Sequence, residues 1–146
     1  MHKALNYLAL ARKAGRVELG EEPVGIAARA LHARLVIVAS DASDHCWRRA
    51  KSFVAGSGQQ AIRVPFTKDE MGMVTGRQSL AIAAFTDPAL ALAFTEALDE
   101  PEKYQKELED LRDRTHRVRQ RQLEEKAHQR NVRMGKSRKA PGMKKN

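Results

Sequence analysis

Two uninterrupted apolar runs limit the folds open to this chain more than any other feature of its sequence. They read LVIVA over residues 35–39 and LAIAAF over residues 80–85. A run without polar alternation is typical of a strand that is covered on both faces, as in a sheet between two layers of helices. We therefore expect an α/β fold.

Caps and the spacing of apolar residues predict the remaining elements. The predicted strands are 16–19, 35–39, 62–66 and 79–86. The predicted helices are 2–14, 23–31, 44–55, 68–74 and 88–98. This alternation of helices and strands predicts a three-layer α-β-α sandwich around a four-stranded mixed sheet.

The C-terminal third has a different character. Apolar residues thin out after Leu98, so the hydrophobic core is expected to end near there. Residues 102–130 lack Gly and Pro and predict a long helix, and Thr115 and Gln122 at heptad positions argue against a stable coiled coil. From Gly135 the composition is typical of disorder. The predicted parts are an α/β domain over 1–99, a charged helical extension over 100–134 and a disordered basic tail over 135–146.

Positive charge is concentrated at the C-terminal end. The chain has a formal net charge of +9, and residues 114–146 hold 12 Lys and Arg against 2 Asp and Glu, whereas residues 1–99 hold 12 against 10. Phosphate is the usual partner of such a segment. An anionic membrane is the alternative, but the segment lacks the Trp, Phe and Leu face of an interfacial helix. Nucleic acid is therefore the preferred partner.

The sequence contains no recognisable catalytic or metal-binding motif. No P-loop, GxGxxG, HExxH or nucleophile-elbow pattern occurs. His45 and Cys46 would be half a metal site, but Cys46 is the only cysteine. Asp41 and Asp44 fit capping roles at a strand-to-helix connection. We expect no enzyme activity, no metal and no cofactor.

Other sequence features bear on location and assembly. A single cysteine allows no internal disulfide, the N-terminus lacks the apolar segment of a signal peptide, and no stretch approaches ~18 apolar residues. We expect a cytoplasmic monomer that does not contact membranes.

Five segments together resemble a known family. They read LALARKAG, LGEE, ARLVIVASDAS, MGMVTGR and LAIAAFTD. In order and spacing they are similar to the kink-turn-binding ribosomal-protein superfamily, especially its small bacterial YlxQ-type members, over roughly residues 5–98. The resemblance implies the same sandwich fold and an RNA site. In that site the helix start after the first strand grips a kinked duplex at sheared G·A pairs, and a loop before the last strand covers an extruded base, because distorted RNA is easier to read than a regular duplex.

The resemblance assigns this site to particular residues. The turn and the loop, together with cations that could reach phosphate, give the candidate set: Gly20, Glu21, Glu22, Arg29, Arg12, Lys13, Arg16, Val74, Thr75, Gly76 and Arg77. The loop spans 74–79, and Gly72 and Gly76 match family glycines. The cations at the end of the first helix contribute only if that helix end and the loop converge on the turn.

The family motif is altered where RNA would be read. Family members show Gly-x-Asn-Glu-x-x-Lys, and this chain has Glu22, Pro23 and Ile26 at the Asn, Glu and Lys positions. Glu22 cannot donate hydrogen bonds, Pro23 has no backbone N–H, and Ile26 carries no charge. Arg29 lies near the stripe of Ile26 and is a candidate replacement. Gly25 within a helix costs about 1 kcal/mol relative to alanine, which suggests close approach by another backbone or a nucleotide.

Two aromatic residues are further candidates for contact with a base. Trp47 and Tyr7 could stack on one, although a single Trp on an amphipathic helix is more often part of the packing. Arg48, Arg49 and Lys51 lie beside Trp47 in the sequence and would form a modest basic patch.

Two functions remain open on the sequence. The first is a non-catalytic RNA-binding protein that recognises kink-turn-like or ribosomal RNA, associates with the ribosome, and uses its basic tail for additional phosphate contacts. The alternative is a protein-interaction module that kept the fold, with Ile26 as the anchor for a protein partner.

Overall fold

The computed structural model describes residues 2–138, and every predicted element is present in it. In chain order the elements are α1 (Lys3–Lys13), β1 (Val17–Leu19), α2 (Glu21–Arg29), β2 (Leu35–Val38), α3 (Asp44–Val54), β3 (Ala61–Arg63), α4 (Lys68–Thr75), β4 (Ile82–Phe85), α5 (Pro88–Ala97) and α6 (Gln105–Arg138). Residues 139–146, most of the predicted disordered tail, lie outside the described part of the chain.

The four strands form one mixed sheet in the order β1-β4-β2-β3. β4 is antiparallel to both β1 and β2, whereas β2 and β3 are parallel. It follows that β1, β2 and β3 run in the same direction, so their carboxyl ends share one edge of the sheet with the start of β4. We call this the carboxyl edge. The connections after these three strands and before β4 all meet there.

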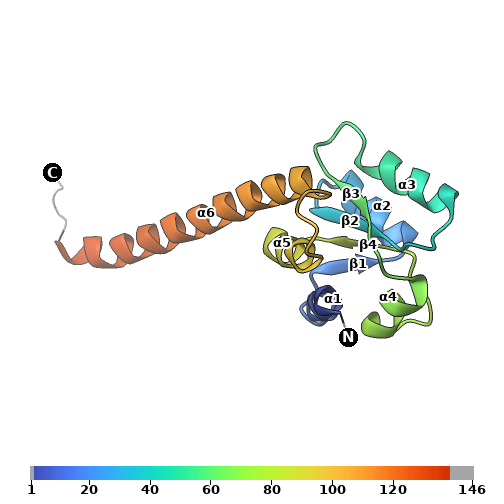
Figure 1. The fold of residues 1–146 in the computed structure, drawn as a ribbon. Helices are drawn as coiled ribbons and strands as arrows, with labels where there is room; N and C mark the ends of the chain where they lie inside the picture. The colour runs from blue at the N-terminus through green and yellow to red at the C-terminus, as the bar shows by residue number, and fades with distance from the viewer. Residues whose placement is uncertain (1, 139–146) are drawn as a thin grey trace. The chain divides into compact units, whose positions relative to one another are not determined.

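Helices cover both faces of the sheet, as predicted. α1 packs against α4 and α5 in one layer, and α2 packs against α3 in the other (Figure 1). None of the helices among the described residues is long and apolar enough to cross a membrane.

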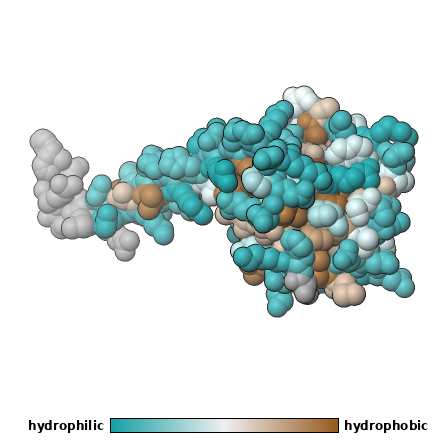
Figure 2. All heavy atoms as spheres, viewed as in Figure 1, coloured by the Kyte–Doolittle hydropathy of each residue, from teal (hydrophilic) through white to brown (hydrophobic). Residues whose placement is uncertain are grey.

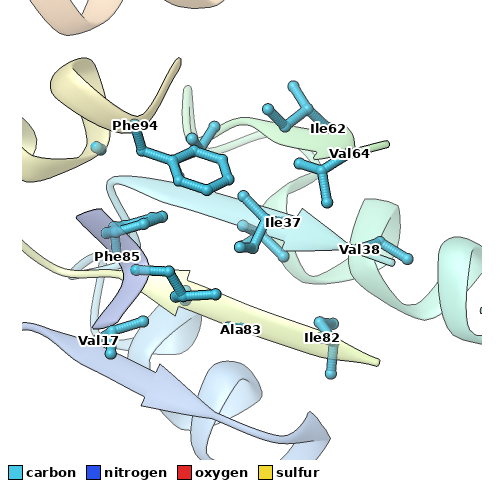
Figure 3. Close-up of a cluster of buried hydrophobic side chains, with 14 of the residues drawn as sticks. Val17, Ile37, Val38, Ile62, Val64, Ile82, Ala83, Phe85 and Phe94 are labelled. Carbon is cyan, nitrogen blue, oxygen red and sulfur yellow. The ribbon is translucent and has the colours of Figure 1, made fainter. Parts of the chain in front are cut away.

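The two apolar runs form the centre of the core. All residues of β2 and β4 are buried, and Figure 3 shows side chains from the sheet packed together with Phe94 of α5. The ring centroids of Phe85 and Phe94 lie 5.1 Å apart. Burying an aromatic side chain of this size contributes about 1.5–3 kcal/mol to folding. By contrast, hydrophilic side chains cover most of the visible outer surface of residues 2–112 (Figure 2).

The core extends further along the chain than predicted. Tyr104, Leu108 and Leu111 are buried members of it, so the expectation that the core ends near Leu98 is wrong. Their spacing of four and three residues puts them on one face of a helix, but the charged residues between them hide this pattern in the composition. The first compact unit of the chain accordingly spans Met1–Arg112, and a second begins at Asp113.

All four strands are shorter than predicted, β3 and β4 by more than one residue. β3 ends at Arg63, three residues early, and beyond Val64 the N–H of Ser40 donates to the carbonyl of Phe66 over 2.8 Å. β4 starts at Ile82, three residues late. The N–H of Leu80 donates to the carbonyl of Lys68 over 3.0 Å, which ties the preceding residues to α4 instead of the sheet.

Candidate functional site

The first part of the candidate site is the turn between β1 and α2. Gly20 has φ 98° and ψ 163°, a conformation that strongly favours glycine. Its N–H donates to the carbonyl of Ile82 over 3.0 Å, and its own carbonyl accepts from Val24 over 3.1 Å. No side chain caps the start of α2. The first N–H groups of this helix are therefore available at the carboxyl edge for an anionic or polar ligand.

The second part is the loop that follows α4. Gly76 ends the helix in the left-handed conformation, with φ 75°, and the N–H of Arg77 donates back to the carbonyl of Gly72 over 2.9 Å. A β-carbon on Gly72 would lie 2.7 Å from the carbonyl oxygen of Arg77 and 3.0 Å from the backbone of Ser79. Only glycine at position 72 therefore lets the loop fold back onto α4.

Two of the predicted loop residues support the loop from inside. Thr75 is 1% exposed, and its hydroxyl donates to the carbonyls of Met71 and Gly72 over 2.8 and 3.2 Å. Val74 is half-buried against the core. The side chain of Thr75 thus shapes the loop and is not available to a ligand.

The turn, the loop and the end of α1 converge. Nη1 of Arg77 lies 3.6 Å from the point at which a β-carbon on Gly20 would stand, and Nη2 of Arg12 lies 3.3 Å from the corresponding point on Gly76. The predicted convergence is therefore present for these two arginines. We call Arg12, Gly20, Gly76 and Arg77 the arginine–glycine cluster. Lys13, the last residue of α1, and Arg16, which follows the helix, are exposed.

Glu21 is held by an arginine that the family pattern did not include. Its carboxylate forms an ion pair of 2.9 Å with Nε of Arg49 in α3, and both side chains are about half exposed. The guanidinium of Arg49 also lies over the ring of Phe53, 5.1 Å from its centroid. Arg49 thus partly neutralises an acidic group that would otherwise repel phosphate. The sequence offered only one hint of this, the placement of Arg49 in a basic patch.

Three other residues of interest in α2 lie along its exposed face. Glu22 and Arg29 are exposed, as is Ile26, at 54%. Gly25 is buried, and a β-carbon there would lie 3.1 Å from the ring of Phe53 and 3.5 Å from Nη1 of Arg29. The close approach expected at Gly25 is therefore made by an aromatic side chain of α3, and not by a backbone or a nucleotide.

Acidic and thiol groups near the site have structural roles. The carboxylate of Asp41 accepts the N–H of Lys68 over 2.8 Å at the start of α4. Burial raises the pKa of Cys46, and the nearby carboxylate of Glu21 raises it further, while Arg63 and Lys68 oppose the shift. The thiol therefore remains protonated and weakly nucleophilic. Among the described residues no group of three or more His, Cys, Asp or Glu is placed to hold a metal.

Comparisons with known proteins agree with this fold. No family model matches the sequence, and no curated protein matches it. Among solved structures, a protein of unknown function from Bacillus halodurans is similar with a TM-score of 0.63 and 24% identity, covering 68% of this chain and all of that one. The 15.5kD RNA binding protein of Giardia lamblia is similar with a TM-score of 0.56 and 18% identity, covering 68% of this chain and 84% of that one. At these identities the similarity shows a common fold.

Proposed function

We propose that this chain is a non-catalytic RNA-binding protein whose carboxyl edge holds a distorted segment of structured RNA. The observation that carries the proposal is the arginine–glycine cluster. The guanidinium of Arg77 lies beside the uncapped start of α2, and that of Arg12, from α1, lies beside Gly76 in the neighbouring loop. Guanidinium groups and helix N-termini both favour phosphate oxygens, so the cluster suits a sharply bent backbone that brings several phosphates together.

The kind of RNA that we propose follows from the motif residues that this site has lost. Glu22, Pro23 and Ile26 replace residues that would read bases in kink-turn proteins, so base readout by α2 is weak here. Backbone contacts then dominate, and these recognise shape more than sequence. We therefore propose kink-turn-like or ribosomal RNA as the target and association with the ribosome as its setting. The common fold with an RNA binding protein of Giardia lamblia supports RNA binding as such.

A gel-shift titration at low salt tests the proposal. The probes are a kink-turn RNA, the same duplex without its internal loop, and ribosomal RNA. We expect the kink-turn and ribosomal probes to bind more tightly than the regular duplex. Replacing Arg12 and Arg77 together by alanine should weaken binding to all probes and lower the salt dependence by about one unit of log–log slope per lost contact.

The matched control removes two exposed cations outside the cluster. The double variant Lys3→Ala and Lys106→Ala lowers the net charge by the same amount, with both lysines exposed on α1 and α6. Its affinity should stay close to that of the unaltered protein. Equal losses in both double variants would show that only the overall charge matters, and no binding to any probe would refute the proposed function.

The second candidate function is recognition of a protein partner through Ile26. The observation that favours it is the 54% exposure of this side chain at the centre of the altered face. Exposed apolar residues are better suited to a protein than to phosphate. Ile26→Lys separates the two functions. A gain in kink-turn affinity together with loss of a bound protein partner would favour this candidate, whereas loss of RNA affinity would favour the first.

A further inference from the structure

A hollow of about 520 Å³ opens beside β3, at the far end of the sheet from β1. Ser40 and Pro65, which follow β2 and β3, line it, so it belongs to the carboxyl edge. Its other walls include Trp47 of α3, Arg63 of β3, Tyr104 just before α6, and Glu107 in the first turn of α6. The hollow lies entirely within the first compact unit.

Arg63 is fixed in position at this hollow. Its Nη1 donates to the carbonyls of Ser40 and Ala42, each over 3.3 Å, and its Cζ lies 5.3 Å from the centroid of the Trp47 ring. These contacts hold the guanidinium of Arg63 beside the indole of Trp47. They use only one of the guanidinium nitrogens as a donor. A base can pack on either planar group, and the other guanidinium nitrogens can donate to phosphate.

Two lysines add positive charge around the aromatic rings. Nζ of Lys51 lies 5.8 Å from the centroid of Trp47, and Nζ of Lys103 lies 5.3 Å from the centroid of Tyr104. Lys103 also lines the hollow. Cations interleaved with aromatic rings are typical of surfaces that bind single-stranded nucleic acid, where rings hold bases and cations follow the backbone.

The edge of β3 is less suited to an extended peptide. The hydroxyl of Tyr104 donates to the backbone carbonyl of Arg63 over 3.1 Å. A peptide that added a strand at this edge would need the same carbonyl as an acceptor. The hollow therefore favours a ligand that brings a flat ring and a negative charge.

We propose that this hollow is a second RNA site, which takes one unpaired nucleotide of a single strand. The base packs against the Trp47–Arg63 stack, and Arg63 and Lys103 bind the adjoining phosphates. The carboxylate of Glu107 accepts a hydrogen bond from an exocyclic amino group, so the site prefers adenine to uracil. The inference rests on the proposed RNA-binding function and adds a ligand class that the arginine–glycine cluster does not bind.

Trp47 is the only tryptophan of the chain, so its fluorescence reports on this site alone. The experiment titrates the full-length protein with a short oligoadenylate and a short oligouridylate while indole emission is recorded. We expect saturable quenching, with oligoadenylate binding the more tightly. Trp47→Ala, followed with a labelled oligoadenylate, should weaken binding by about fivefold or more.

An exposed lysine provides a variant that leaves the fold undisturbed. Lys103→Ala should weaken oligoadenylate binding and lower its salt slope by about 0.7, the value for one phosphate contact on a single strand. Lys106→Ala is the matched control, since Lys106 is exposed three residues further along, in the first turn of α6, but does not line the hollow, and it should bind as the unaltered protein does. The Arg12 and Arg77 double variant should also keep the quenching.

The outcomes separate this inference from the proposed function. If structured RNA binds but neither oligonucleotide quenches Trp47, the second site is refuted and the first stands. Quenching by a polyglutamate peptide equal to that by oligoadenylate would also refute it, because the hollow would then take any anionic chain. If Lys103→Ala and Lys106→Ala lose oligonucleotide affinity equally, net charge alone explains the binding, and the second site is refuted.

Discussion

The guanidinium group of Arg12 lies over the backbone of Gly76, with Nη2 3.3 Å from the point at which a β-carbon would stand. Through this contact the last turn of α1 meets the loop that precedes β4. Gly76 serves two needs at once, because its φ of 75° disfavours other residues and a side chain would push the guanidinium away.

Gly76→Ala is therefore expected to affect both stability and RNA binding. Strain at a left-handed φ should lower the free energy of unfolding by about 1 kcal/mol, as measured by urea denaturation. RNA affinity should fall as well, because Arg12 must move. Gly56→Ala is the control, since Gly56 has a similar φ of 72° with open space around it. It should cost similar stability and leave RNA affinity unchanged, and equal losses of affinity would contradict the role of Arg12.

Gly72→Ala tests the close contact between α4 and its loop. The added methyl group meets backbone atoms of Arg77 and Ser79, which cannot move without changing the loop, so we expect a loss of about 1–3 kcal/mol in the free energy of unfolding. Gly25→Ala is the contrasting variant. There a ring of Phe53 must shift, and the gain in helix propensity of about 1 kcal/mol offsets the crowding. Equal stability of the two variants in urea would contradict this distinction.

Glu21→Gln tests the ion pair with Arg49. Because both side chains are about half exposed, its loss should change stability by at most about 1 kcal/mol. RNA affinity should rise, since a negative charge near phosphate is removed and Arg49 is released. Glu96→Gln is the matched control, because Glu96 pairs with Arg112 in an equally exposed pair. An affinity gain in both variants, or in neither, would place Glu21 outside the RNA interface.

Tyr104 should make stability depend on alkaline pH. Burial raises the pKa of this phenol above its ordinary value of 10.0, although Lys103 opposes the shift. The unfolded chain therefore ionises first, so the stabilising contribution is complete below pH 10 and is lost as pH rises through the folded-state pKa. Tyr104→Phe should cost about 0.5–1.5 kcal/mol at neutral pH, from the lost hydrogen bond, and should weaken the alkaline decline. Urea denaturation across this range measures both effects, with Tyr7→Phe as the control. An unchanged alkaline decline in Tyr104→Phe would contradict the assignment.

The basic C-terminal segment should set the salt dependence of RNA binding. Deleting residues 114–146 removes 12 Lys and Arg and 2 Asp and Glu. We expect a flatter dependence of affinity on salt, because each phosphate neutralised contributes about 0.7–0.9 to the log–log slope. The preference for kink-turn RNA over regular duplex should survive. A slope equal to that of the full chain would mean that this segment does not contact RNA.

The fold was largely predictable because its main determinants are local. Two fully apolar runs define the central strands, and caps such as Ser43 and Thr67 mark where helices begin. The role of Tyr104 was not predictable, because its packing partners are distant in the sequence and its neighbours are charged. Short-range patterns do not report such contacts.

The candidate site, like the fold, was predictable only where local patterns determine it. Gly20 and Gly76 were identified from the family resemblance, and both adopt positive φ values. The sequence alone could not supply the contact of Arg77 with Gly20 or the pairing of Glu21 with Arg49, since each joins segments far apart in the chain. The burial of Thr75 was missed for a related reason. In the sequence, a threonine whose hydroxyl bonds to its own helix cannot be distinguished from an exposed polar residue.

The hydrogen bond from Tyr104 to β3 also bears on self-association, that is, on strand pairing between two copies of the chain. β3 is a three-residue strand at the margin of the sheet, and an uncovered margin is a template for pairing with another chain. By occupying the carbonyl of Arg63, Tyr104 blocks part of that template. A chain cut after Leu98 would lose this cover together with Leu108 and Leu111. Self-association through β3 is the expected result, so the segment from Tyr104 to Leu111 shields the margin of the sheet as well as completing the core.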